Sequence, residues 1–256
     1  TGVRSIDFAN VQNGTLVNDD GTLPTGATES SLDSSIDTLV TTYRDLAADT
    51  IGDPLGNDTS TNFPNASIKI LTDGNDSFTG TDGSELIATR DGDDAVNGGA
   101  GNDKLIGGRG IDTLSGGDGV DHLYGLASND ILNGNGGNDY IVAGLGDDTI
   151  SGGEGDDSIL AQTGNDLISS GPGTDVINAG LGNDRITIDG IGNKDVNGGS
   201  GTDTLIINYD GITSLSSFAS ISYDTDTSTV TFTDSSGGTI ATQAVENFTV
   251  GGVTYS

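Results

Sequence analysis

Between residues 71 and 187, one apolar side chain recurs every nine residues along the chain. The recurring residues are Phe78, Ile87, Val96, Leu105, Leu114, Leu123, Leu132, Ile141, Ile150, Ile159, Ile168, Ile177 and Ile186. Nine residues are too few for a helix and its return, but they suffice for a tight turn of about six residues and a strand of about three. The pattern therefore predicts that each unit is half a coil and that apolar residues from both sides form a thin aliphatic core.

The polar positions of the unit are equally regular when Gly98 is taken as position 1. Position 4 is glycine in every unit except one, where Ser128 replaces it. Glycine at positions 1, 2 and 4 permits the left-handed backbone that a tight turn needs. Position 6 is acidic in all thirteen units, at Asp76, Glu85, Asp94, Asp103, Asp112, Asp121, Asp130, Asp139, Asp148, Asp157, Asp166, Asp175 and Asp184.

The acidic position creates an electrostatic problem. In such a coil, each position-6 acid lies beside its equivalent one coil away, about 4.8 Å along the stack. A row of this kind is strongly repulsive unless multivalent cations lie between its members, and carboxylate oxygens with turn carbonyls suit Ca²⁺ best. The chain as a whole has 39 acidic against 8 basic side chains and a formal charge of −31. This charge repels nucleic acid and anionic membrane surfaces, which leaves cations as partners.

The units GGAGND, GGRGID, GGDGVD, GGEGDD and GGSGTD resemble the GGxGxDxUx nonapeptide of the RTX (repeats-in-toxin) family. The resemblance covers residues 71–206, about half of the chain. It implies an all-β fold, a right-handed parallel β-roll with two nonapeptides per coil. It also implies that Ca²⁺ is held between turns two units apart, and that a bacterial type I system exports the unfolded chain.

Adjacent acids of one row are expected to bracket one calcium ion. One row runs Asp76, Asp94, Asp112, Asp130, Asp148, Asp166, Asp184, and the other runs Glu85, Asp103, Asp121, Asp139, Asp157, Asp175. After a one-residue insertion in IDGIGNKDVN (188–197) and a last unit at 198–206, Asp195 and Asp203 complete the predicted ligands. The uninterrupted section predicts roughly 8 to 11 calcium ions with the affinity typical of extracellular modules, about 10⁻⁴ to 10⁻³ M. Because an unfolded chain has no preformed site, the binding free energy is folding free energy.

The segments that flank the repeat differ from it in pattern. Residues 1–70 are predicted to form an N-terminal cap that is partly helical, because apolar residues at helical spacing predict a helix near 31–48. Residues 207–256 alternate apolar and polar positions around turn-forming segments, which predicts a short antiparallel β cap. Such caps protect the ends of a stack, whose unpaired edges would otherwise bind other molecules.

Positions 7 and 9 point outward and are predicted to form two different faces. One face is small and hydroxylated, with Ser77, Thr79, Ala95, Asn97, Thr113, Ser115, Asn133, Thr149, Ser151 and Ser169. The other carries Leu86, Ile106, His122, Tyr124, Tyr140, Val142, Leu160 and Val176. An apolar patch of this size is usually covered, here by the helix near 31–48 or by self-association with a partner subunit.

The sequence favours a protein that is not an enzyme. His122 is the only histidine, there is no cysteine, and the regularly spaced carboxylates belong to the calcium rows. No apolar run approaches membrane-spanning length, so membrane insertion is not expected. Because the chain has no methionine, we interpret it as part of a longer, processed protein.

Three functions remain open from the sequence. The first is a structural module of a secreted bacterial surface protein, such as an adhesin, surface-layer or matrix component, that folds on calcium outside the cell. The second is the C-terminal folding and secretion module of an RTX enzyme or toxin. The third is recognition of ice or polysaccharide by the hydroxylated face.

Overall fold

The computed structural model describes residues 11–12, 15–16, 67–209, 211–224 and 227–255. The chain divides into two units, Thr1–Pro64 and Asn65–Ser256. In the first unit, β1 (Val11–Gln12) pairs with β2 (Thr15–Leu16) in antiparallel orientation. The helix predicted near 31–48 lies outside the described residues, so the N-terminal cap stays a prediction.

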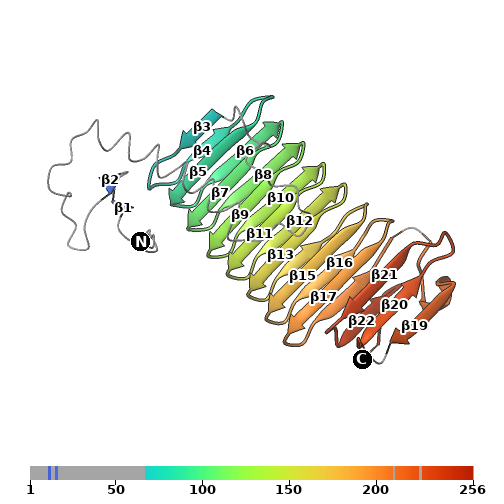
Figure 1. The fold of residues 1–256 in the computed structure, drawn as a ribbon. Coiled ribbons are helices and arrows are strands. Elements are labelled where there is room, and N and C mark those ends of the chain that lie inside the picture. The colour runs from blue at the N-terminus through green and yellow to red at the C-terminus, as the bar shows by residue number, and fades with distance from the viewer. Residues whose placement is uncertain (1–10, 13–14, 17–66, 210, 225–226, 256) are drawn as a thin grey trace, which may run out of the picture. The chain divides into compact units, whose positions relative to one another are not determined.

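The second unit is a parallel β-solenoid of about eight turns, in which the chain alternates between two sheets (Figure 1). One sheet contains β4 (Ser77–Thr79), β6 (Ala95–Ala100), β8 (Thr113–Asp118), β10 (Ile131–Gly136), β12 (Thr149–Glu154), β14 (Leu167–Ser169), β16 (Arg185–Ile188), β18 (Thr204–Ile207), β22 (Asn247–Val250) and β23 (Val253–Tyr255). The other contains β3 (Ser67–Ile70), β5 (Glu85–Asp91), β7 (Lys104–Arg109), β9 (His122–Ala127), β11 (Tyr140–Leu145), β13 (Ser158–Thr163), β15 (Asp175–Leu181), β17 (Lys194–Ser200), β21 (Thr239–Gln243), β20 (Thr229–Thr233) and β19 (Ser220–Asp224).

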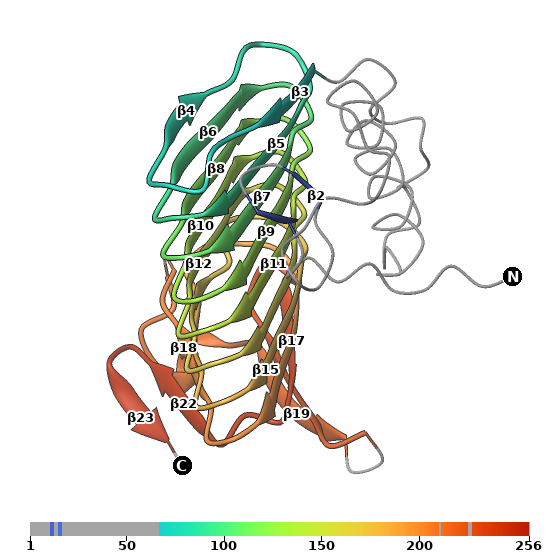
Figure 2. The same ribbon diagram turned by 90° about the vertical axis from the view of Figure 1, so that its left-hand side faces the viewer.

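Figure 2 shows these sheets as two stacks of rungs, with β4 to β12 along one side and β3 to β11 along the other. Helix is almost absent from the described residues, where one 3₁₀ turn is found at Leu215–Ser217. The predicted all-β roll with two nine-residue units per coil is therefore confirmed.

The strands are longer than the repeat pattern predicts. Strands such as β7 and β12 have six residues rather than three and extend from position 7 of one unit to position 3 of the next. Between β7 and β9, Leu105 pairs with Leu123 and Gly108 pairs with Leu126. The glycines at positions 1 and 2 therefore lie within the strands, because the backbone on both sides of position 1 pairs with the next coil. Only positions 4 to 6 form the turn.

Position 4 has the left-handed backbone that the sequence predicts. Gly110 has φ +120° and Gly146 has φ +134°. Ser128, which replaces glycine in one unit, also has a positive φ, 89°. The backbone conformation is thus set by the coil, and Ser128 adopts it at a cost that glycine avoids.

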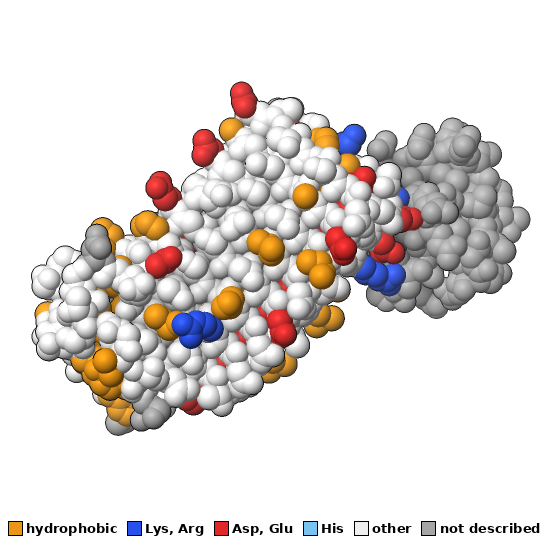
Figure 3. Space-filling model, turned by 180° about the vertical axis from the view of Figure 1, so that it is seen from behind, with side chains coloured by type: hydrophobic (Ala, Val, Ile, Leu, Met, Phe, Trp, Pro, Cys, Tyr) orange, Lys and Arg blue, Asp and Glu red, His pale blue; other side chains and the backbone are white. Residues whose placement is uncertain are grey.

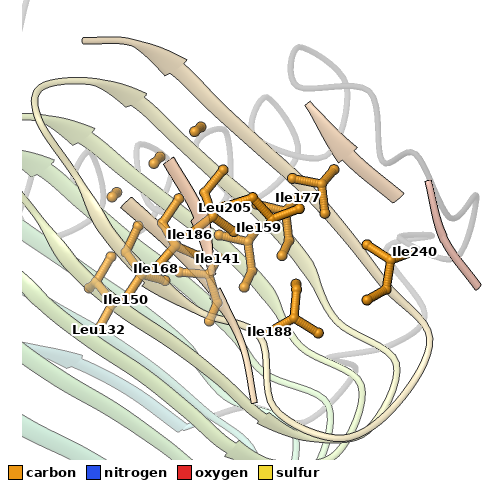
Figure 4. Packing of buried hydrophobic residues seen from close by; sticks show 14 of the residues in the cluster. Leu132, Ile141, Ile150, Ile159, Ile168, Ile177, Ile186, Ile188, Leu205 and Ile240 are labelled. Carbon is orange, nitrogen blue, oxygen red and sulfur yellow. The ribbon is translucent and has the colours of Figure 1, made fainter. Parts of the chain in front are cut away.

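The predicted aliphatic core is confirmed. The position-8 side chains from Ile87 to Ile186 are at most 3% exposed, and Phe78 at the first coil is partly buried against them. Figure 4 shows side chains from both sheets meeting in this narrow interior. Position 1 also faces inward, and Ala143, Ala161 and Ala179 add their methyl groups to the core with no exposure.

The C-terminal cap is only partly antiparallel. As predicted, β19, β20 and β21 form an antiparallel meander, and β22 and β23 form a hairpin. However, β21 and β22 pair in parallel with β17 and β18, so the cap extends both stacks before it ends them. Inside it, the Phe232 ring contacts the rings of Phe218 and Phe248, with centroid distances of 5.1 and 5.6 Å. These rings close the aliphatic core.

The face of the ten-stranded sheet is not a continuous hydroxyl lattice. Ile131 and Leu167 are 41% and 44% exposed at position 7, and Arg185 is exposed at the same position. Ile131 and Leu167 pair with Thr149 from the two strands beside it, and Arg185 pairs with Leu167 in the next strand. Figure 3 shows acidic side chains mainly along the edges of the roll and hydrophobic side chains scattered over its surface.

The face of the eleven-stranded sheet carries the predicted apolar cluster. Tyr124, Tyr140 and Val142 are 6%, 7% and 5% exposed and form a cluster of their own. Ile106 and Leu160 pack against this cluster, which we call the tyrosine cluster. Lys104 also belongs to this face, and its Nζ lies 5.0 Å from the centre of the Tyr124 ring.

A matched pair of isoleucines tests the core. We expect Ile141→Ala, at the fully buried position 8, to lower the free energy of unfolding by about 2 to 5 kcal/mol. Ile131→Ala makes the same chemical change at an exposed position 7 and should change it by less than about 1 kcal/mol. Denaturant unfolding at saturating calcium measures both values. Equal losses would contradict the inward orientation of position 8.

Candidate metal centre

The acidic residues at position 6 form two rows, one before each sheet. Each acid directly precedes a strand or begins it, because position 6 is where the turn ends. The row before the ten-stranded sheet contains Asp76, Asp94, Asp112, Asp130, Asp148, Asp166, Asp184 and Asp203. The row before the eleven-stranded sheet contains Glu85, Asp103, Asp121, Asp139, Asp157 and Asp175. All of them except Asp76 are buried.

Backbone hydrogen bonds connect the acids of each row. In the second row, the Asp121 N–H donates to Asp139 Oδ1 at 2.8 Å, and the Asp139 N–H donates to Asp157 Oδ1 at 2.9 Å. The first row follows the same rule from Asp76 to Asp203, across distances of 2.7 to 3.0 Å. After the first acid of each row, one oxygen of each carboxylate is therefore committed to the neighbouring coil and fixes the orientation of the group.

The second carboxylate oxygen is buried without a donor. Among the residues that the structure describes, eleven such Oδ2 atoms have no hydrogen-bond partner, in Asp94, Asp103, Asp112, Asp121, Asp130, Asp139, Asp148, Asp157, Asp166, Asp184 and Asp203. A buried charged oxygen without a partner is strongly destabilising. The geometry therefore calls for a cation or a proton at each of these atoms.

The second oxygen of the carboxylate lies close to position 1 of its own unit. A Cβ on Gly116 would collide with Asp121 Oδ2, and a Cβ on Gly134 would collide with Asp139 Oδ2. The same relation holds for Gly98, Gly107, Gly125 and Gly152 and the acids of their own units. The carboxylate thus points back toward position 1, where Ala143, Ala161 and Ala179 show that a methyl group is also accommodated.

A calcium ion fits this donor set better than a transition metal does. No group of three or more His, Cys, Asp or Glu side chains converges on one point in the described residues. Most ligands at each turn would therefore be backbone carbonyls, with carboxylates supplied one at a time by successive coils. Ca²⁺ accepts six to eight oxygen ligands of mixed type in flexible geometry, whereas Zn²⁺ selects nitrogen and sulfur.

Burial raises the pKa of these carboxyls well above the ordinary value of 3.8. The pKa is about 6 for Asp103, Asp112 and Asp148, about 7 for Asp121, Asp130, Asp157 and Asp166, and about 8 for Asp139. Loss of hydration is the main cause of the raised pKa. The backbone N–H that the neighbouring acid donates lowers the pKa, and the charges of neighbouring carboxylates raise it further. The pKa values of Asp175, Asp184 and Asp203 are raised for the same main reason. In the absence of a cation, the folded roll therefore favours protonated carboxyls.

Asp195 is not a member of either row, contrary to prediction. It is exposed and pairs with Val176, at the outward position 7, whereas Lys194 pairs with Asp175 at position 6. The inserted residue shifts the register by one, and strand pairing places Lys194 inward.

Two residues of the rows were missed by the repeat pattern. Lys194 takes the place of an acid at position 6. The sequence Asn-Lys-Asp-Val at 193–196 indicates this when the one-residue insertion is placed before it. Glu246 extends the first row into the cap, because its Oε2 accepts the Asp203 N–H at 2.7 Å. Glu246 lies outside the repeat, so no periodic signal identifies it.

His122 has no role in the metal geometry. It begins β9 on the face of the tyrosine cluster, and its ring lies 5.6 Å from that of Tyr140. The described residues also contain no helix that is long and apolar enough to cross a membrane.

Comparison with protein families agrees with the geometry. The family model described as RTX calcium-binding nonapeptide repeat matches in four copies, at residues 72–105, 79–114, 115–150 and 151–186. A search of curated proteins found no match to the chain. The matched residues contain both rows from Asp76 to Asp184.

The raised pKa values predict how the metal-free chain responds to pH. Because the folded-state values of about 6 to 8 exceed 3.8, the folded roll binds more protons than the unfolded chain. This contribution to stability is complete below about pH 4 and is lost as pH rises through about 6 to 8. Circular dichroism of the chelated chain should therefore show β-structure in acid that disappears across this range.

Saturating calcium provides the control for this titration. The β-structure should then persist across the upper range, because the carboxylates no longer need protons. A chelated chain that becomes more stable as pH rises through about 6 to 8 would contradict the raised pKa values.

Proposed function

Residues 72–186 belong to the RTX calcium-binding nonapeptide-repeat family, and from this premise we propose that the chain is a structural module of a secreted bacterial surface protein that folds on calcium outside the cell. RTX repeats bind calcium. The observation that carries the proposal is the set of eleven buried carboxylate oxygens without a donor, at regular intervals along two rows.

The residues of the roll couple folding to calcium concentration. At low calcium and neutral pH, the row carboxylates are ionised in the unfolded chain, so folding must either bury their charge or bind protons. Both oppose folding in a chain of formal charge −31. At the calcium concentrations of extracellular modules, the carboxylates and turn carbonyls offer hard oxygen ligands only in the folded coil. Such a chain remains unfolded inside the cell, as type I export requires, and folds on the outside.

The structural role is favoured over ice or polysaccharide recognition. A flat array of small hydroxyl groups was the basis of that alternative, and Ile131, Leu167 and Arg185 interrupt the array. A folding and secretion module of a larger RTX enzyme or toxin would bind calcium through the same residues. The two roles differ in whether a catalytic or toxin domain belongs to the same protein.

We also propose that the tyrosine cluster is covered in the functional protein, either by residues 31–48 or by a second copy of the chain. Tyr124, Tyr140 and Val142 lie on the outer side of a sheet, where most residues of a solenoid are polar, and yet each of them is at most 7% exposed. Cover by a second copy would make the roll part of a larger assembly.

A conservative substitution in the middle of a row tests the calcium proposal. Asp139→Asn retains an oxygen that can accept the Asp121 N–H but removes the charge. We expect it to bind about one fewer calcium ion and to need more calcium for folding, because ligand charge sets affinity at such sites. Calorimetry gives the ion count, and circular dichroism against calcium gives the midpoint.

Asp195→Asn is the matched control, since Asp195 is exposed at the outward position 7 of β17 and lies outside both rows. It should leave the ion count and the midpoint unchanged. A wild-type chain that is fully folded in chelator at neutral pH and binds no calcium would overturn the proposed function.

Charged substitutions test the covered face. Tyr124→Asp together with Tyr140→Asp should lower the melting temperature or dissociate an oligomer, because a carboxylate would be buried on that face. Thr113→Asp together with Thr149→Asp adds the same charges to exposed positions of the other face. Thermal unfolding and sedimentation velocity at saturating calcium compare the variants. Equal changes in melting temperature and oligomeric state for the two double variants would contradict the proposal that this face is covered.

A further inference from the structure

The second row of carboxylates ends in a basic residue. Glu85, Asp103, Asp121, Asp139, Asp157 and Asp175 follow one another at intervals of one coil, and the next residue at this position is Lys194. Lys194 begins β17 and pairs directly with Asp175 in β15. It therefore enters the turn where the next carboxylate of the row would lie.

The Lys194 ammonium lies among three oxygen atoms of the preceding turn. Its Nζ donates to Gly171 O at 2.9 Å, to Gly173 O at 2.7 Å and to Asp175 Oδ2 at 2.7 Å. The side chains of Lys194 and Asp175 are both 0% exposed. Two turn carbonyls and one carboxylate oxygen thus converge on a single positive charge, in the manner of ligands around a metal ion.

Asp175 differs from the other aspartates of the rows in one respect. From Asp94 to Asp203, every other row aspartate in the described part of the chain has a buried Oδ2 without a donor, whereas Asp175 Oδ2 receives the Lys194 ammonium. At the other turns this Oδ2 atom needs a cation. At this turn the Lys194 ammonium already supplies the positive charge.

A backbone carbonyl takes the place of the missing carboxylate oxygen. In the rest of the row, each acid N–H donates to Oδ1 of the next acid, but the Asp175 N–H donates to the Asn193 backbone carbonyl at 2.9 Å. The insertion alone does not break a row, because in the first row the Asp184 N–H still donates to Asp203 Oδ1 across it. The identity of Lys194, together with the Asn193 carbonyl, ends the second row.

We infer that Lys194 is a tethered cation that fills the last cation site of the second row in place of calcium. Elsewhere, a divalent ion between two coils would balance one carboxylate from each. At this turn one ammonium balances one carboxylate, so the charge is matched without a free ion. In the folded roll, the last coil of the second row therefore needs no calcium ion of its own at this turn. This inference rests on the proposed calcium function.

Restoring a carboxylate at this position tests the inference. Lys194→Asp supplies the missing ligand beside Gly171 O, Gly173 O and Asp175 Oδ2, and we expect it to bind about one more calcium ion than the wild-type chain. Arg185→Asp makes the same change of charge at an exposed, outward position of β16 and should bind the wild-type number. Equilibrium dialysis with metal analysis gives both counts at saturating calcium.

A second measurement does not depend on the folding of that variant. Lys194→Met leaves the Asp175 carboxylate buried without a cation, so it should lower the melting temperature at saturating calcium. Adding Asp175→Asn to Lys194→Met removes the buried charge and should recover part of the loss. Independent, additive effects of the two substitutions would overturn the role of Lys194 as the partner of that carboxylate.

The outcomes separate this inference from the proposed function. If the wild-type chain binds calcium and a folded Lys194→Asp variant binds the same number, the inference is wrong and the proposed function stands. If the wild-type chain binds no calcium, both are wrong, because there is then no ion for Lys194 to replace.

Discussion

The roll depends on carboxylates that are buried at a spacing of one coil. One oxygen of each accepts the backbone N–H of its neighbour and so holds two coils in register, as Asp139 does for Asp121. The other oxygen is left buried without a donor. The group that organises the turn is therefore also the group that makes the turn unstable when no positive charge is present. Folding of the roll and binding of a cation therefore depend on each other.

The thin core makes this dependence strong. Each nine-residue unit contributes one apolar residue at position 8, with an occasional alanine at position 1, to a single file between the sheets. A core of this size buries little apolar surface per residue, while ordering the backbone of every residue costs conformational entropy. Ion binding supplies free energy that a globular domain obtains from a larger core.

The C-terminal end of the roll uses other means. The first row continues into the cap through Glu246, the second ends at Lys194, and the phenylalanine rings of the cap close the aliphatic core. Aromatic packing and an internal ion pair are independent of free calcium. This end therefore has interactions that can persist when the other coils have lost their ions.

The periodic sequence predicts the periodic part of the structure well. A strict repeat of nine residues gives the side of the coil, the inward position and the two acidic rows, because every unit meets the same neighbours one coil away. The strand length was underestimated, since glycine was interpreted as a turn residue although Gly107 and Gly108 lie in β7. Backbone pairing with the next coil determines this, and glycine content does not reveal it.

The departures from the repeat were harder to predict. A one-residue insertion can be aligned in two ways, and the alternatives exchange Lys194 and Asp195 between the inside and the outside of the coil. Strand pairing decides between them, because it requires Val196 to lie opposite Ile177 in the core. The periodic signal ends where neighbouring units cease to be equivalent, and interactions particular to this chain begin there.

Protons and calcium act on the same atoms of this chain. Burial raises the pKa of the row carboxyls, so the metal-free fold favours a proton where the calcium-bound fold needs an ionised oxygen. Calcium binding must then release protons, and acid must weaken calcium binding. At neutral pH without calcium, the buried carboxyls are only partly protonated, and the charge of −31 favours the expanded chain. The same buried oxygens thus account for an unfolded state in one compartment and a folded state in another.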